Sequence, residues 1–182
     1  NNTGGRIYFL SGINATVNLF TYDFNAKPGK AISQLTSNVA DHNGLSVSIN
    51  SKKEDVVVTS MMSISLPSEL FRINTATGET NQITHTNDAL LSSVKLAKAE
   101  KRMIRTTDGK SMLTWVIYPP DFDPAKKYPA LLYCQGGPQT TVSQFFSYRW
   151  NFQLMAANGY IIVAPNRRGL PSFGSDWNDE IS

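Results

Sequence analysis

Two short apolar segments, at residues 130–134 and 160–164, are joined by a double-glycine turn and a helical segment. Short strands without polar alternation are typical of parallel pairs, which need a long crossover connection, usually a helix. This pattern predicts an α/β unit in the second half of the chain. Residues 130–134 are expected to form a fully buried strand, with Cys134 inside it. The strand leads directly into Gln135-Gly136-Gly137-Pro138.

The first half contains an imperfect internal repeat. Residues 19–23 and 70–74 are similar strand segments, and each is followed by a glycine turn and by a second similar segment, at 34–38 or 82–87. A period of about 50 residues with several short strands per unit is typical of stacked propeller blades. A β-sandwich would also give short strands, but it does not predict the repeat. We therefore expect the last two or so blades of a β-propeller over residues 1–97.

The pattern changes near residue 97. Residues 103–107 and 112–118 are predicted to pair as an antiparallel hairpin around Asp108-Gly109. The order of hairpin, strand, helix and strand, which follows, is that of an α/β domain. We interpret residues 98–182 as the start of an α/β-hydrolase domain that is truncated before the nucleophile.

The glycine turn is the candidate for chemistry. Without side chains, Gly136 and Gly137 let a backbone N–H approach a substrate carbonyl. In an α/β-hydrolase, one donor of the oxyanion hole comes from this loop and the other from the residue after the nucleophile. A plain turn that needs positive φ is the alternative, but the surrounding order of elements favours the oxyanion interpretation.

These segments resemble the prolyl oligopeptidase family of serine peptidases, particularly its bacterial dipeptidyl-peptidase and acylaminoacyl-peptidase members. The resemblance is carried by residues 127–138, 152–160 and 165–174. It implies a β-propeller ahead of the hydrolase domain, a peptide substrate, an acyl-enzyme route and no cofactor. The first expected activity is release of dipeptides from free N-termini, and the alternatives are release of an acylated residue or esterase activity. A periplasmic or cell-envelope location is favoured, with a cytoplasmic one as the alternative.

The resemblance also assigns roles to individual residues. Gly136-Gly137-Pro138 matches the oxyanion motif of the family, with Gly137 as the backbone donor. Gln135 stands where many members have His or Tyr, and its amide could donate a hydrogen bond in their place. Arg168-Gly169 matches an Arg-Gly loop of the family. Arg168 is expected to be structural, because a guanidinium can bind several loop carbonyls.

Other reactive side chains have structural interpretations. Ser172 has Gly-x-x-Ser-x-Gly spacing, whereas a nucleophile elbow needs Gly-x-Ser-x-Gly. Cys134 lacks a base, and the two histidines, His42 and His85, both fall in the blade region. A Ser–His–acid triad therefore cannot be assembled within this chain, and its members are expected downstream.

Composition sets further limits. The net charge is +3, and the spread basic residues near position 100 are interpreted as a solvated strand face, which argues against a nucleic-acid partner. A single cysteine excludes an internal disulfide and any multi-cysteine metal site. No segment approaches the roughly 18 apolar residues that span a membrane.

The chain begins without a methionine and ends without a stop signal for its last helical segment, so we expect an internal fragment whose partner is the remainder of the parent. In isolation, residues 160–164 would leave an unpaired edge or exposed apolar faces, which favours self-association or a homo-oligomer. The rival class is a non-catalytic propeller that acts as a binding or scaffold protein.

Overall fold

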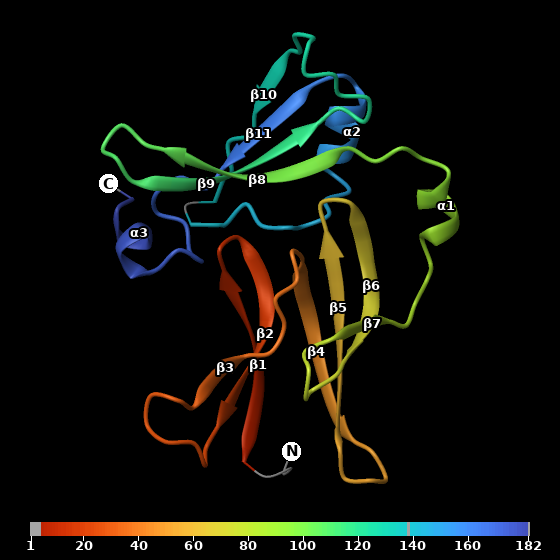
Figure 1. Cartoon of the computed structure of the whole chain (residues 1–182), viewed down its shortest axis with the longest axis vertical. Helices are drawn as coiled ribbons and strands as arrows, with labels where there is room; N and C mark the ends of the chain where they lie inside the picture. Colours follow the sequence, from red (N-terminus) through yellow and green to blue (C-terminus); the bar gives the residue numbers. More distant parts are fainter. Residues whose placement is uncertain (1–4, 138, 182) are drawn as a thin grey trace.

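Two β-sheets meet in this computed structural model, which describes residues 5–137 and 139–181. The strands of the second sheet lie across one end of the first (Figure 1). Pro138, part of the predicted oxyanion motif, lies outside the described residues.

The first sheet consists of two antiparallel runs. The first run has the order β1-β2-β3, with bounds Arg6–Ile13, Thr16–Asp23 and Ile32–Gln34. The second has the order β4-β5-β6-β7, with bounds Asp41–Ile49, Asp55–Ser63, Leu66–Ile73 and Thr80–Gln82. A single parallel bridge in the described part of the chain, Val17 with Asp41, joins β2 to β4. The two runs are therefore separate meanders in contact at one end.

The predicted repeat is confirmed by a hydrogen-bond pattern that occurs once in each run. The Leu19 N–H donates to Thr36 Oγ1 at 3.0 Å, and the Leu70 N–H donates to Thr84 Oγ1 at 2.8 Å. A glutamine amide then binds the carbonyl of each threonine, Gln34 at 2.8 Å and Gln82 at 2.7 Å. In both runs the threonine hydroxyl satisfies a strand N–H that the short outer strand leaves without a backbone acceptor.

The acceptor of the threonine hydroxyl differs between the runs. Thr36 donates to Asn18 Oδ1 at 2.9 Å, whereas Thr84 donates to the Glu69 carboxylate. Glu69 also accepts hydrogen bonds from the backbone and side chain of Asn87. These bonds, the one from Thr84 first, lower the pKa of Glu69 to about 2.

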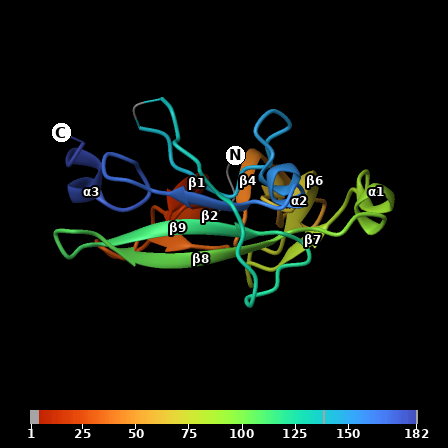
Figure 2. The same cartoon turned by 90° about the horizontal axis from the view of Figure 1, so that it is seen from above.

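The second sheet has the order β10-β11-β9-β8. Its strands span Lys98–Arg105 (β8), Ser111–Tyr118 (β9), Ala130–Leu132 (β10) and Ile161–Pro165 (β11). Helices α1 (Asp88–Ser92), α2 (Phe152–Ala157) and α3 (Ser175–Asp179) complete the described elements. Figure 2 shows α1 and α3 at opposite ends of the molecule. No helix among the described residues is long and apolar enough to cross a membrane.

Two local predictions for this sheet are confirmed. β8 and β9 pair antiparallel around the turn at Gly109, and β10 pairs parallel with β11 across the α2 crossover. Helix α2 begins at Asn151, whose side chain accepts a hydrogen bond from the Leu154 N–H at 3.0 Å. The chain leaves the helix through Gly159, whose φ is 86°.

The prediction of a fully buried strand at residues 130–134 is wrong. β10 has three residues, all exposed, with Leu132 at 65 %, and Cys134 is exposed too. The reason is position, because β10 is the edge of the sheet and pairs only with β11 among the described residues. The unpaired edge expected at residues 160–164 therefore lies on β10, since β11 is paired on both sides.

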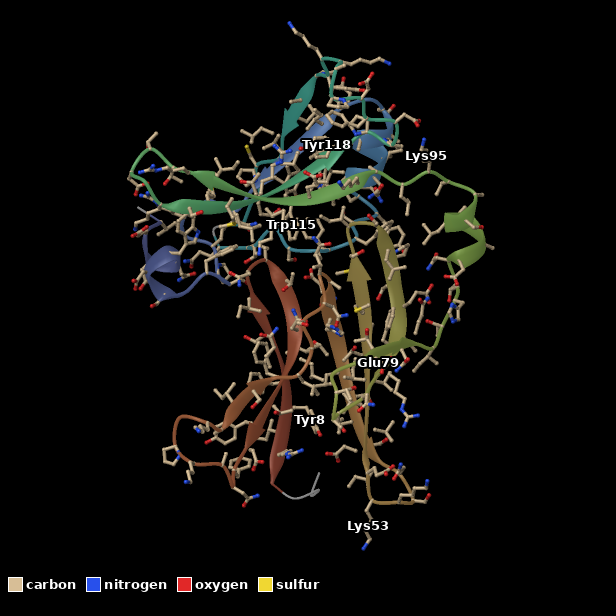
Figure 3. The ribbon with its side chains drawn as sticks, viewed as in Figure 1. Tyr8, Lys53, Glu79, Lys95, Trp115 and Tyr118 are labelled. Carbon is tan, nitrogen blue, oxygen red and sulfur yellow. The ribbon has the colours of Figure 1, made fainter. Side chains whose placement is uncertain are left out.

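The core continues from one sheet into the other. One buried cluster combines Ala15 and Ile64, from turns of the first sheet, with Trp115 and Ile162 of the second. Figure 3 shows Trp115 between the two sheets. A separate buried cluster, which includes Leu19 and Phe71, forms the core of the first sheet. The shared cluster fixes how the two sheets sit against each other.

We predict that Thr36→Val lowers the free energy of unfolding by about 1–3 kcal/mol. Valine keeps the shape of threonine but leaves the Leu19 N–H without an acceptor and the Asn18 amide oxygen without this donor. Urea denaturation of the chain measures the change. Thr107→Val, at an exposed position, is the control and should change stability by less than about 0.5 kcal/mol. Equal effects of the two substitutions would contradict the role of the Thr36 hydroxyl.

Candidate functional site

The glycine turn follows the carboxyl end of β10. The Tyr133 N–H donates to the Val163 carbonyl at 2.8 Å, which extends the β10–β11 pairing by one bond. Gly137 then has a φ of 68°, and a Cβ at this position would lie 3.2 Å from Thr140 Oγ1. A Cβ on Gly136 would meet nothing within 4 Å. Gly137 is thus the position where the backbone needs glycine.

Polar groups at this turn have free bonding capacity. Within residues 5–137 and 139–181, no acceptor is found for the N–H of Gly136 or Gly137. The Gln135 Oε1 atom is buried and likewise has no donor in this part of the chain. Two N–H groups therefore remain available as donors to a ligand or to further chain, as an oxyanion site requires, whereas the Gln135 oxygen can only accept a hydrogen bond.

An apolar groove of about 400 Å³ lies beside the turn. Leu132, Cys134, Gly136 and Trp150 are among the residues that line it. Trp150 is 52 % exposed, so two large apolar side chains, Leu132 and Trp150, face solvent next to the edge strand. Apolar surface of this kind marks a place where another segment or molecule binds.

The chain after the turn is held by the loop that follows β11. The Gln139 amide donates to the side chain and carbonyl of Asn178 at 3.3 Å, and Thr141 Oγ1 donates to the Pro171 carbonyl at 2.8 Å. Residues 139–141 are therefore attached to residues 171–178. The glycine turn lies between this attachment and β10.

Asn166 is the strongest of these supports, and the sequence analysis missed it. Its side chain is fully buried and binds Val142 twice, accepting from the N–H at 2.8 Å and donating to the carbonyl at 3.0 Å. Trp115 Nε1 donates to the same carbonyl at 3.0 Å. A signal was available, because Asn166 is a polar residue directly after the apolar strand β11, at the carboxyl end where α/β sheets place their sites.

Among the residues that the structure describes, Arg168 binds carboxylates and not the loop carbonyls that we expected. Its guanidinium pairs with Asp108 of the β8–β9 turn and, at 3.4 Å, with Glu180. Lys110 pairs with Glu180 as well. The pKa of Asp108 is lowered, first by the hydrogen bond from Thr106 and then by the Arg168 charge. Asp108 is within reach because the turn of the β8–β9 hairpin lies next to Arg168, and Glu180 comes from the chain after α3.

Gly169 is required by packing. It has a φ of 86°, and a Cβ at this position would lie 2.6 Å from an Ile181 side-chain carbon. Ser172 also has a positive φ, of 81°, and its carbonyl accepts a hydrogen bond from the Asn14 N–H at 2.8 Å. These contacts make the Arg-Gly loop a support between the β1–β2 turn and the glycine turn.

The two histidines lie away from the glycine turn in the fold. His42 is fully buried in β4, where its ring hydrogen-bonds Thr59 Oγ1 and Asn38 Oδ1, and burial lowers its pKa to about 4. His85 is exposed and pairs with Asp88 at 2.7 Å. In the part of the chain that the structure describes, no group of three or more His, Cys, Asp or Glu side chains could hold a metal ion.

Comparison with known proteins shows which family the chain resembles. The profile of the prolyl oligopeptidase family matches residues 146–182. Dipeptidyl-peptidase 5 of Porphyromonas gingivalis is 49 % identical over 176 residues, which is 97 % of this chain. The chain is similar to the prolyl oligopeptidase family. The dipeptidyl-peptidase 5 of Porphyromonas endodontalis is 43 % identical to it over the same share of the chain.

The chain spans about a quarter of the length of these relatives. The matched region is 25 % of the P. gingivalis protein and 24 % of the P. endodontalis protein. Among solved structures, Pyrococcus horikoshii acylaminoacyl peptidase matches with a TM-score of 0.78 and 22 % identity. That match covers 97 % of this chain and 26 % of the other. The two sheets and their mutual arrangement are thus those of one region of a prolyl oligopeptidase-like fold.

We predict that stability declines as the pH falls from about 6.5 to about 4 and that His42 causes part of the decline. The unfolded chain takes up a proton near the ordinary pKa of 6.5, whereas native His42 stays neutral until about pH 4. The native state is therefore disfavoured as the pH falls through this window. Urea midpoints of His42→Gln should depend less on pH, and those of the exposed control His85→Gln should follow the wild type. Parallel curves for all three proteins would contradict this assignment.

We predict that Asn166→Ala lowers the free energy of unfolding by about 2–3 kcal/mol, because it leaves the buried Val142 N–H without an acceptor. Urea denaturation measures the loss. Asn81→Ala, at an exposed position of β7, is the matched control and should have little effect. If the two variants unfolded at the same urea concentration, Asn166 would not be a support of this segment.

Proposed function

We propose that this chain forms the junction between the propeller and the catalytic domain of a serine exopeptidase. In this proposal β4–β7 form one complete four-stranded blade, and β1–β3 are three strands of the preceding one. The repeated threonine contacts support this assignment, since they mark equivalent positions in the two runs. β8–β11 would then be the first strands of an α/β-hydrolase domain. The order β10-β11-β9-β8, with its parallel pair and crossover helix, supports that start.

The proposal rests chiefly on the Gly137 turn. A positive-φ glycine at the carboxyl end of β10, with N–H groups that have no acceptor in the described chain, can stabilise the oxyanion of a tetrahedral intermediate. The second donor of such a site follows the nucleophile in sequence. The serine, aspartate and histidine would lie beyond residue 182, so this chain alone would be inactive.

Gln135 would serve the same site. A buried amide oxygen without a donor is costly, so a partner outside the described residues is expected. That partner could be a backbone N–H of the bound peptide, with the amide nitrogen left to face the oxyanion. The Asn166 contacts would hold the chain directly after the loop that carries Gln135 and Gly137.

The substrate proposed is a short peptide with a free N-terminus, from which a dipeptide is released. The 49 % identity to a protein named dipeptidyl-peptidase 5 supports this choice over an acylated N-terminus. The acylaminoacyl peptidase match, at 22 % identity, supports the fold alone. The propeller would restrict entry to small or unfolded peptides. A non-catalytic propeller remains the rival class, and it differs by lacking a reactive serine.

We predict that the protein containing this chain hydrolyses dipeptidyl chromogenic substrates with a free amine and is labelled by a fluorophosphonate probe. The 182-residue chain by itself should not be labelled. Gly137→Ala should lower kcat by roughly 100-fold, because a side chain at this φ displaces the donor N–H. Gly29→Ala is the control for backbone strain, since Gly29 has a φ of 79° in the distant β2–β3 turn.

Three results would contradict the proposal. Hydrolysis of acylated substrates alone would replace the dipeptidyl assignment with the acylaminoacyl one. Absence of both labelling and hydrolysis in a folded protein would favour the binding or scaffold class. Equal kcat values for Gly137→Ala and Gly29→Ala would remove Gly137 from the oxyanion site.

A further inference from the structure

One segment between the two sheets, residues 142–153, carries several hydrogen bonds to the first sheet; it follows the glycine turn and enters α2. The Ile64 N–H, in the β5–β6 turn, donates to the buried Gln144 side chain at 3.4 Å. In the same turn, Ser65 Oγ accepts a hydrogen bond from the Gln153 amide at 2.8 Å. The segment that follows the glycine turn therefore also makes hydrogen bonds to the first sheet.

Asp41 makes the contact nearest to the turn. It opens β4 at the bridge to β2, is 3 % exposed, and accepts a hydrogen bond from the Val17 N–H at 3.1 Å. Its other oxygen accepts from Ser143 Oγ at 2.5 Å. Burial raises the pKa of Asp41, and the hydrogen bond from Ser143 opposes that rise. One carboxylate thus joins both runs of the first sheet to the residue after Val142.

The hydrogen bond between Asp41 and Ser143 matters because Ser143 directly follows Val142. Val142 is already fixed by Asn166 and Trp115, so the chain between Leu132 and Val142 is held at both ends. The glycine donors lie between these ends. Ser143 is the next residue along, and Asp41 fixes it from the opposite side, that of the first sheet. Ser143 shares a peptide bond with Val142, so a shift at Ser143 would act directly on the Asn166 and Trp115 bonds that hold the far end of the turn.

We propose that Asp41, through Ser143, is a positioning residue for the oxyanion turn, supplied by the first sheet and not by the sheet that carries the turn. This inference rests on the proposed function of Gly137. An oxyanion donor acts only when it is correctly placed in the transition state. Loss of the contact should therefore reduce kcat and leave KM nearly unchanged.

The test uses the full-length protein that contains this chain, with three substitutions. Ser143→Ala removes the hydroxyl and leaves Asp41 its hydrogen bonds from the Val17 and Gln144 N–H groups, so the fold should persist. Ser143→Thr keeps a hydroxyl and should rescue the effect. Ser147→Ala is the matched control, because Ser147 Oγ accepts from the Arg149 and Trp150 N–H groups in the same segment and, among the described residues, has no hydrogen bond to the first sheet.

We expect Ser143→Ala to lower kcat by about tenfold with KM within about twofold of the wild type, whereas Ser147→Ala and Ser143→Thr keep kcat near the wild-type value. Hydrogen exchange of the peptide covering residues 133–144 should be faster in Ser143→Ala than in Ser147→Ala. Thermal unfolding of each variant shows whether it is folded.

Unchanged kcat and unchanged exchange in Ser143→Ala would overturn the inference, as would a raised KM at constant kcat. If the wild-type protein hydrolyses no peptide, the proposed function fails, and the exchange measurement still decides the positioning role. Faster exchange confined to residues 133–144 would support that role, and unaltered exchange would remove it.

Discussion

The double hydrogen bond between Asn166 and the backbone of Val142 is the interaction on which the contact between the two sheets depends. It attaches the segment after the glycine turn to the loop after β11, and Trp115 reinforces it from β9. These groups are buried, so each unmade bond would cost the full desolvation of a polar group. Val142 itself is buried in the core that the two sheets share, and these bonds satisfy both its N–H and its carbonyl there.

The attachment of Val142 to Asn166 distinguishes the glycine turn from an ordinary surface turn. A positive-φ glycine in a free loop is only a turn, whereas Gly137 lies between a paired strand and a fixed residue, Val142. Its N–H can therefore be held at a defined place, as an oxyanion donor must be. The Asp41–Ser143 contact extends the same support into the first sheet.

Much of the fold could be predicted from local patterns. The repeat at Leu19 and Leu70 was visible because the same residue types recur, and the structure shows that the equivalent threonines make the same bonds. The β8–β9 hairpin and the α2 crossover followed from turn and cap residues. The prediction that β10 is buried was wrong. An apolar sequence indicates that a strand favours the interior, but it does not say where in the sheet the strand lies, and β10 lies at the edge. Arg168 was predicted to be structural from its loop, but its carboxylate partners come from distant segments.

The amino-acid sequence was enough to locate the glycine turn and the repeat, to show the family resemblance, and to show that no histidine follows residue 85 in this chain. These depend on residue type and spacing along the chain, which the sequence states directly. The tertiary structure alone decided that Asn166, Trp115 and Asp41 meet around residues 142–143. Such contacts join residues far apart in sequence, and they arise only when two sheets pack over a shared core, so no local pattern contains them.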